Sequence, residues 1–190
     1  MSPQRSNRSQ LIDGTLRCLE RLPAERVTAR AIAEESGANL ASITYHFGSK
    51  DDLVTEAVVV GLDRWLEEID AALAGITSGR YERAAEIVAA TRRGHEGLAR
   101  TFLAALARAP HDERVRATLA AGFRRTRSAV ADVLGTGRDR AGLDAAALTV
   151  ALFNGLLFQT LVDPDLAVEG DRFRAAQARL AGMRDPAASG

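Results

Sequence analysis

Apolar residues along this chain recur mainly three and four positions apart, the spacing that gathers them on one face of an α-helix. The alternating pattern typical of β-strands is almost absent, and Ala, Leu, Arg and Glu dominate. The pattern therefore predicts a succession of helices with short connections. The predicted helices cover residues 12–22, 28–36, 40–47, 50–74, 80–91, 93–109, 112–135, 144–163 and 169–183.

Residues that end or begin helices stand between the first segments. Pro23 ends the first predicted helix. Gly37 ends the second, in the position where a left-handed residue closes a helix, and Gly48 ends the third. Asn39 is a favourable N-cap for the third helix. The run from Ser49 to Asp52 is a variant capping box at the start of the fourth, with Asp in place of Glu.

The fourth predicted helix is much longer than the first three. Its continuous apolar stripe consists of Val54, Val58, Leu62, Trp65, Leu66, Ile69 and Leu73. Gly61 lies within it, where Gly costs ~1 kcal/mol relative to Ala, and indicates a bend or a close helix crossing. We predict an all-α fold in which residues 1–52 form a three-helix domain and residues 53–190 a larger helical bundle, joined by this helix.

Composition excludes several classes of protein. The chain is 46% hydrophobic and 26% charged, as in an ordinary globular protein. Cys18 is the single cysteine, so an intrachain disulfide and a metal site of several thiolates are excluded, and we expect no metal and no cofactor. Residues 1–10 are polar, and no apolar run approaches the ~20 residues of a membrane span. We therefore expect a cytoplasmic protein without a membrane partner.

Residues 28–47 have the layout of a helix-turn-helix, in which the second helix enters the major groove of DNA and the first braces it. Formal net charge is zero, but the distribution of charge matters more than its total, and residues 1–50 are slightly basic. Ile43 and Phe47, four positions apart, anchor the second helix. Its opposite face therefore points outward, and its small and polar side chains allow close approach to base edges.

Within this stretch the chain resembles the TetR/AcrR family of transcriptional regulators. The residues that carry the resemblance are Thr28, Ile32, Ala33, Gly37, Tyr45, His46, Phe47, Lys50 and Leu53. The match covers about residues 5–55, and the C-terminal part agrees only in character, through the helix 146–162 with its Asn154-Gly155 pair. One departure is Thr44, where the family often has Tyr, so that the aromatic phosphate contact falls to Tyr45 alone.

The resemblance implies double-stranded DNA, a small-molecule effector and a second copy of the chain as partners. It implies DNA contacts by Thr28, Arg30, Asn39, Leu40, Ala41, Ser42, Thr44, Tyr45, His46 and Lys50. Thr28, Arg30, Tyr45 and Lys50 would meet phosphates, whereas Leu40, Ala41, Ser42 and Thr44 would face base edges. His46 has two interpretations, a packing residue beside Phe47 or a phosphate contact. The implied function is a dimeric repressor that a largely apolar effector releases from a palindromic operator.

Two further surfaces are predicted in the bundle. Candidate effector-binding residues are Trp65, Ile69, Thr101, Phe102, Leu106, Phe123, Thr126, Phe153, Asn154, Phe158 and Gln159, although such a set also describes an ordinary core. The penultimate helix is apolar nearly all round and must be covered on more than one side. Candidate dimer-interface residues are Leu152, Leu156, Leu161, Phe173 and Leu180, with Leu148, Val162 and Met183 beside them. Alternatively, the 80–91 helix covers the spare face within one chain.

Two other functions compete with a regulator. An enzyme is not expected, because no nucleophile elbow, phosphate loop or metal quartet is present, although a catalytic carboxylate pair stays open among 25 acidic residues. A structural adaptor could use the helix-turn-helix as a packing unit. Operator binding that depends on Tyr45 would separate the regulator from both.

Overall fold

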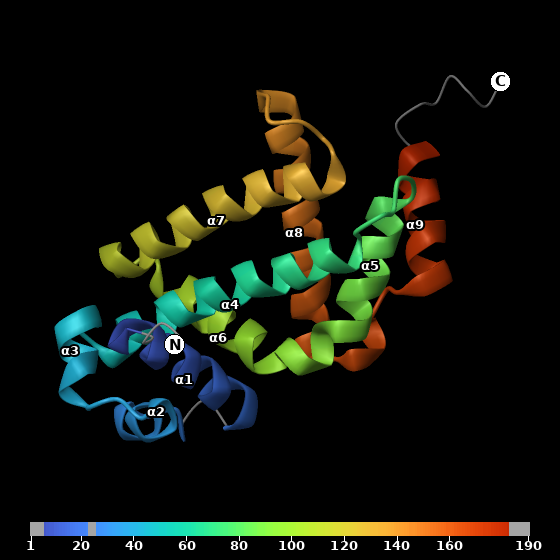
Figure 1. Ribbon diagram of the computed structural model, residues 1–190. Helices are drawn as coiled ribbons and strands as arrows, with labels where there is room; N and C mark the ends of the chain where they lie inside the picture. The colour runs from blue at the N-terminus through green and yellow to red at the C-terminus, as the bar shows by residue number, and fades with distance from the viewer. Residues whose placement is uncertain (1–5, 23–25, 183–190) are drawn as a thin grey trace.

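A computed structural model describes residues 6–22 and 26–182, and these residues contain helices and no strand (Figure 1). The α-helices are α1 (Asn7–Arg21), α2 (Ala29–Ser36), α3 (Ala41–Phe47), α4 (Lys50–Ala72), α5 (Arg80–Thr91), α6 (Glu96–Arg108), α7 (Glu113–Leu134), α8 (Arg140–Val162) and α9 (Gly170–Gly182). Two 3₁₀ segments, η2 (Arg92–His95) and η3 (Pro164–Leu166), connect them. The all-α prediction is confirmed. The roles predicted for Pro23 and Met183 lie outside the described residues.

Several helix ends differ from the sequence prediction. The predicted 93–109 helix is divided into η2 and α6, and Gly94, a poor helix former, lies in the 3₁₀ part. α8 begins four residues early, because the Asp139 carboxylate accepts a hydrogen bond from the Gly142 amide at 2.9 Å and caps it. α3 begins at Ala41, one residue late, and the Asn39 side chain accepts from the Ala41 amide at 2.9 Å. Asn39 therefore caps the turn before α3 rather than the helix itself.

The first turn of α4 has the expected cap. The Ser49 hydroxyl accepts a hydrogen bond from the Asp52 amide at 3.0 Å and donates to the Asp52 carboxylate at 2.8 Å. Asp51 and Asp52 lie at the positive end of the helix dipole, where carboxylates are stabilising. The Ser49 N-cap is thus confirmed, whereas the Asp52 carboxylate contacts the Ser49 hydroxyl and not the backbone amide that a capping box would engage.

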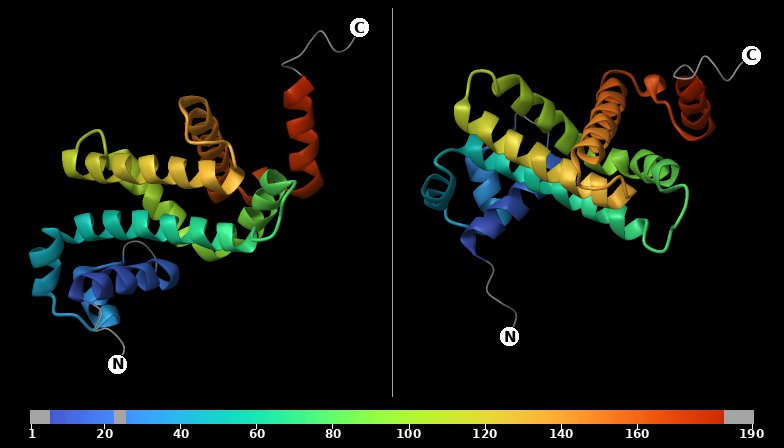
Figure 2. Two further views of the ribbon diagram at one scale, coloured as in Figure 1. Left: turned by 45° about the horizontal axis from the view of Figure 1, so that its top comes forward. Right: turned by 90° about the horizontal axis from the view of Figure 1, so that it is seen from above.

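α4 and α7 lie side by side and run in the same direction through the centre of the molecule (Figures 1 and 2). Arg114 pairs with Asp52 at the start of the two helices, at 3.1 Å, and Arg125 pairs with Asp63 about three turns later, at 3.0 Å. Between these pairs the helices approach closely at Gly122, where a Cβ atom would lie 2.9 Å from Val59. A displacement of one helix therefore acts on the other along their shared length.

One continuous core joins α1, α2, α3, the first half of α4, α6 and the start of α7. The domain boundary predicted at residue 52 falls inside this core, so the first three helices pack against the bundle rather than hang from a linker. Gly61 permits the crossing, because a Cβ there would lie 2.7 Å from Leu98 and 2.8 Å from Leu16. Of the two interpretations of Gly61, the structure supports the close crossing.

α8 is exposed or half-buried over most of its length. Only Gly142, Ala146 and Leu157 of this helix are buried, whereas Leu148 is 70% exposed and Val162 85%. Among the described helices α8 is also long and apolar enough to cross a membrane, with a mean hydropathy of 1.7 in its most apolar window. The sequence analysis expected no segment long and apolar enough to span a membrane, and by length and composition this expectation was wrong. Thr149, Asn154 and Gln159 interrupt the run of apolar residues, but the average hydropathy of the helix stays high. One such helix is weak evidence of a membrane span.

Candidate nucleic-acid interface and ligand cavity

α2 and α3 are held by caps, a small core and an ionic tie to α1. The Thr28 hydroxyl caps α2 by accepting from the Ala31 amide at 3.1 Å. Ile43 and Phe47 of α3 are almost fully buried, as their four-residue spacing predicts. The Arg17 guanidinium donates to the Glu35 carboxylate at 2.8 Å, which joins α1 to the end of α2 and lowers the Glu35 pKa. α3 is thus fixed by one face only.

The other face of α3 is open to solvent. Leu40, Ala41, Thr44 and Tyr45 are exposed, with Leu40 at 50% and Tyr45 at 84%, and no described part of the chain covers them. Ser42 is half-buried, as is the last predicted contact on this helix, His46, whose ring meets Tyr45 edge-on at 4.8 Å. The face combines small apolar groups, two hydroxyls and one phenol.

Two basic side chains flank this face. Arg30, in the first turn of α2, is exposed and makes no hydrogen bond or ion pair with any described residue. The Lys50 ammonium lies 2.9 Å from the Asp51 carboxylate at the start of α4. The hydrogen bond that Lys50 donates to the Asp51 carboxylate is the main reason why the Asp51 pKa lies below its usual value. α2, α3 and α4 thus each contribute to one surface.

Ion pairs join the corner between α6 and α7 to the first turn of α4. The Arg114 guanidinium lies 3.1 Å from the Asp52 carboxylate, and Arg108 lies 3.8 Å from Asp51 and 3.1 Å from Asp112. Asp112 in turn caps α7 by accepting from the Arg114 and Val115 amides, both at 3.1 Å. Sequence analysis missed these contacts, because ion pairs between residues some 60 positions apart leave no periodic signal.

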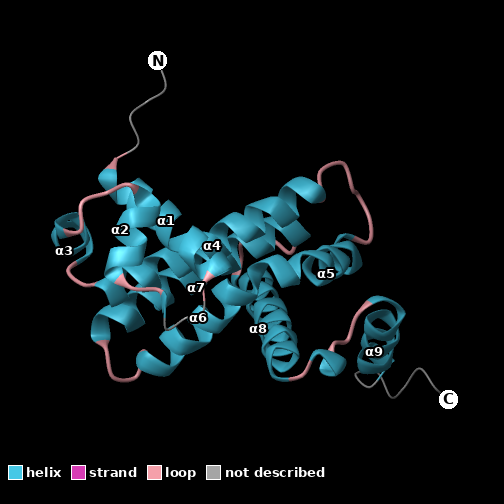
Figure 3. Ribbon diagram, turned by 90° about the horizontal axis from the view of Figure 1, so that it is seen from below, coloured by secondary structure: helices cyan, strands magenta, loops and turns pink. Residues whose placement is uncertain are grey.

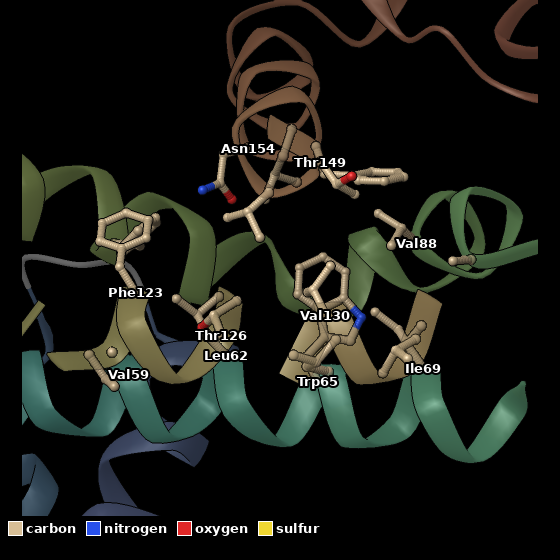
Figure 4. Close-up of a pocket in the computed structure, with 18 of the residues that line it drawn as sticks. Val59, Leu62, Trp65, Ile69, Val88, Phe123, Thr126, Val130, Thr149 and Asn154 are labelled. Carbon is tan, nitrogen blue, oxygen red and sulfur yellow. The ribbon is translucent and has the colours of Figure 1, made fainter. Parts of the chain in front are cut away.

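A cavity of about 140 Å³ lies between α4, α5, α6, α7 and α8 (Figure 4). Its lining residues are Val59, Leu62, Trp65, Leu66, Ile69, Ala84, Val88, Phe102, Leu119, Gly122, Phe123, Thr126, Val130, Val133, Leu134, Thr149, Val150, Phe153, Asn154 and Leu157. None of these side chains is charged, and three carry hydroxyl or amide groups. Mostly apolar walls with few polar groups are typical of small-molecule sites.

Seven of the eleven predicted effector residues line this cavity: Trp65, Ile69, Phe102, Phe123, Thr126, Phe153 and Asn154. The other four do not. Leu106 and Phe158 pack against the core of the first helices, and Gln159 is exposed. The Thr101 hydroxyl donates to the Gly97 carbonyl at 2.7 Å within its own helix. The other lining residues on α4, Val59, Leu62 and Leu66, follow the helical spacing that leads to Trp65 and Ile69. Sequence analysis missed both lining residues of α5, Ala84 and Val88, and found only Phe153 and Asn154 of the α8 wall.

Trp65 is fixed at the wall by its neighbours. Its indole N–H donates to the Thr91 hydroxyl at 2.8 Å, and the His95 ring stacks on it at 4.3 Å. Both ring nitrogens of His95 point to groups outside the cavity: Nδ1 lies 3.0 Å from the Thr91 carbonyl, and Nε2 lies 3.9 Å from the Glu68 carboxylate. The indole therefore offers the cavity apolar surface only.

The predicted dimer-interface residues fall into two groups. Leu152 and Leu180 are exposed, whereas Leu156 and Leu161 are half-buried. Phe173 is buried within its own chain, 6.0 Å from Tyr81 and 6.0 Å from Phe153, so it faces α5 and not outward. α5 does not cover the outer face of α8. α8 runs from the middle of the molecule toward α9, which lies at the end opposite α2 and α3 (Figure 3).

No metal site is evident in the part of the chain that the structure describes, where no group of three His, Cys, Asp or Glu side chains could hold an ion. Cys18 is buried, and burial raises the pKa of its thiol. A buried thiol of raised pKa is poorly reactive.

Family comparisons bear on both halves of the chain. A model of bacterial regulatory proteins of the tetR family matches residues 11–57, and a model of the BetI-type transcriptional repressor C-terminal domain matches residues 79–184. Among curated proteins, none matches this sequence.

Solved structures share the fold. A putative transcriptional regulator from Pseudomonas aeruginosa PAO1 is 23% identical, with 93% of this chain and 89% of that chain covered and a TM-score of 0.66. A putative transcriptional regulator from Saccharomonospora viridis in complex with choline is 24% identical, with 82% and 85% covered and a TM-score of 0.58. The multidrug binding protein EbrR complexed with proflavin is 22% identical, with 82% and 89% covered and a TM-score of 0.57.

Proposed function

This chain belongs to the TetR family of bacterial regulatory proteins, and we propose that it is a repressor that binds a near-palindromic operator as a homodimer and is released by a small, largely apolar effector. The observation that carries the proposal is the open face of α3. One side of this short helix is locked by Ile43 and Phe47, and the other presents small and polar groups with nothing over them. A helix of this kind fits the major groove.

The proposed contacts divide by chemistry. Thr28, Arg30, Tyr45 and Lys50 bind phosphates and set the position of α3 on the duplex. Leu40 and Ala41 contact thymine methyl groups, whereas Ser42 and Thr44 offer hydroxyls to base edges. The ion pair of Lys50 with Asp51 does not prevent a phosphate contact, because exposed pairs contribute only ~0–1 kcal/mol. Asn39 and His46 support the two ends of α3 and contact the backbone of the DNA.

Lys50→Ala and Thr44→Ala should have different effects on DNA binding. Removing the lysine should weaken binding to every duplex and lower the slope of log affinity against log salt concentration by about one unit per subunit. Removing the threonine hydroxyl should change the preference at single base positions by ~1 kcal/mol or more, with the salt slope unchanged. Fluorescence anisotropy over a salt series measures both. Equal salt slopes for the wild type and Lys50→Ala would remove Lys50 from the phosphate contacts.

The proposed dimer interface is the outer face of α8 together with α9. Leu148, Leu152, Val162 and Leu180 are large apolar side chains exposed in the single chain, and exposed apolar patches mark interaction surfaces. Gly155 lies among them with no atom within 4 Å of its Cβ position, which permits close approach of a second helix. We propose that a second copy, rather than lipid, covers α8, and that the protein is cytoplasmic. Twofold symmetry then matches a palindromic operator.

Leu148→Glu should convert the dimer to a monomer. The side chain is exposed in the isolated chain, so the change should leave folding intact, but in the dimer it would bury an unpaired carboxylate. Light scattering with size-exclusion chromatography measures the mass. Leu40→Glu places the same charge on an exposed leucine of α3 and should leave the dimer intact. A wild type of about 20 kDa at micromolar concentration would contradict the interface, since 20.3 kDa is the mass of one chain.

Control of DNA binding is proposed to pass along α4 and α7. Both helices line the cavity, and both have their first turns at the DNA-facing end, where Arg114 and Asp52 meet. An effector that spreads the cavity moves these turns and changes the separation of the two α3 helices in the dimer. A preference of the effector for the released state by ~1–3 kcal/mol gives roughly 5- to 150-fold weaker operator binding.

A further inference from the structure

We infer that the cavity selects an uncharged ligand with an apolar body of about one ring and one hydrogen-bonding group, which is bound by Asn154 and Thr126. This inference rests on the proposed function and names the class of its effector. It differs from choline and proflavin, the molecules bound in two structures of the same fold.

The absence of charge in the cavity wall excludes cations. Among its lining residues there is no Asp or Glu, so an ammonium group that enters it loses its hydration and gains no counter-charge. Aromatic faces attract cations, but removing an ion from water costs more than such a contact returns. Trp65, the strongest aromatic candidate, already has the His95 ring stacked on it at 4.3 Å. One face of the indole is therefore covered, and the aromatic rings of the wall have no carboxylate beside them to supply the counter-charge that a cation needs.

The size of the cavity sets the size of the ligand. Its volume of about 140 Å³ is close to that of an apolar protein cavity of ~150 Å³ that stays dry and binds benzene. A single ring or an aliphatic group of similar bulk therefore fits without displacing the walls. Larger ligands require α4 and α7 to separate at Gly122, where they are in close contact.

Two polar groups in the wall provide the specificity. Asn154 on α8 and Thr126 on α7 come from facing sides of the cavity (Figure 4). Neither side chain has a hydrogen-bond partner among the described residues, whereas the third polar residue, Thr149, donates to the Ala145 carbonyl at 3.0 Å. A polar group that faces an apolar cavity without a partner is satisfied by a ligand that supplies one. The amide both donates and accepts, so hydroxyl and carbonyl ligands both suit it.

Three probes of one shape test this inference: benzyl alcohol, toluene and benzylammonium. Calorimetric titration of the full chain without DNA should show benzyl alcohol binding at least tenfold more tightly than benzylammonium. Asn154→Leu should lower the ratio of benzyl alcohol affinity to toluene affinity roughly fivefold, because only the alcohol loses a hydrogen bond. Gln159→Leu, an amide on the same helix but outside the cavity, should leave that ratio unchanged.

The inference is overturned if benzylammonium binds as tightly as benzyl alcohol, if Asn154→Leu leaves the ratio unchanged, or if none of the three probes binds. DNA binding by the same preparation, measured separately, keeps these failures distinct from failure of the proposed function. A chain that binds its operator but prefers the cation remains a regulator of a different ligand class. A chain that binds benzyl alcohol but no DNA contradicts the regulator.

Discussion

Phe47→Ala is expected to lower the free energy of unfolding by about 3–5 kcal/mol, the cost of truncating a fully buried aromatic side chain. Phe47 is 1% exposed, and the Arg8 guanidinium lies 5.3 Å from its ring centre. The core cluster that contains Phe47 continues into α4, α6 and α7, so the loss of stability should appear in the unfolding of the whole chain. Urea unfolding followed by circular dichroism measures it.

Tyr45→Ala is the matched control, two residues away on the same helix. Tyr45 is 84% exposed, so its removal should change stability by no more than about 0.5 kcal/mol. It should nevertheless weaken DNA binding tenfold or more, because a hydrogen bond to a charged group is worth ~1.5–3 kcal/mol. If Tyr45→Ala were as unstable as Phe47→Ala, or bound DNA like the wild type, the assignment of the two faces of α3 would be wrong.

Gly97→Ala is expected to disrupt the joint between the first helices and the bundle. A Cβ atom at this position of α6 would lie 1.9 Å from the Leu19 carbonyl oxygen of α1. A backbone atom cannot rotate away as a flexible side chain can, so α1 and α6 must separate. Overpacking typically costs about 1–3 kcal/mol and occasionally more, and we expect the upper end, which exceeds the ~1 kcal/mol that Ala gains over Gly in a helix.

Gly94→Ala tests whether contact, rather than the loss of a glycine, causes the effect. No atom lies within 4 Å of a Cβ built on Gly94, three residues before Gly97. This variant should be as stable as the wild type or slightly more stable in thermal unfolding. Gly97→Ala should also weaken operator binding beyond its effect on folding, because separating α1 from α6 changes the position of α3 relative to the dimer interface. Equal melting temperatures for the two variants would contradict the close packing of α1 against α6.

The sequence was sufficient to predict the helices and the two faces of α3. Four-residue spacing identified Ile43 and Phe47 as buried and left Tyr45 outside, and both were confirmed. The helix ends were less predictable, because side-chain caps such as Asp139 extend a helix beyond its apolar pattern. The spacing of apolar residues along one helix is a local property, and it predicts which face of that helix is buried.

Contacts between distant helices were the part that sequence could not provide. Phe153 and Phe158 lie on the same apolar helix, yet Phe153 lines the cavity and Phe158 packs against the first core. Periodicity shows that such a helix is apolar nearly all round and cannot assign each side to a neighbour. Phe173 likewise has the spacing of an outward seam but turns inward to Tyr81. The pairing of Arg114 with Asp52 depends on the parallel course of α4 and α7, which is a property of the folded chain.

Selection of DNA from a pool of random duplexes tests the central claim most directly. Purified wild-type protein should enrich two inverted half-sites, because a twofold dimer presents two copies of the exposed α3 face. Thr44→Ala should enrich a sequence that differs within each half-site, and Tyr45→Ala should recover little DNA at the same salt concentration. A pool in which no sequence is enriched, or in which Thr44→Ala and the wild type select identical sites with identical preferences, would contradict the account.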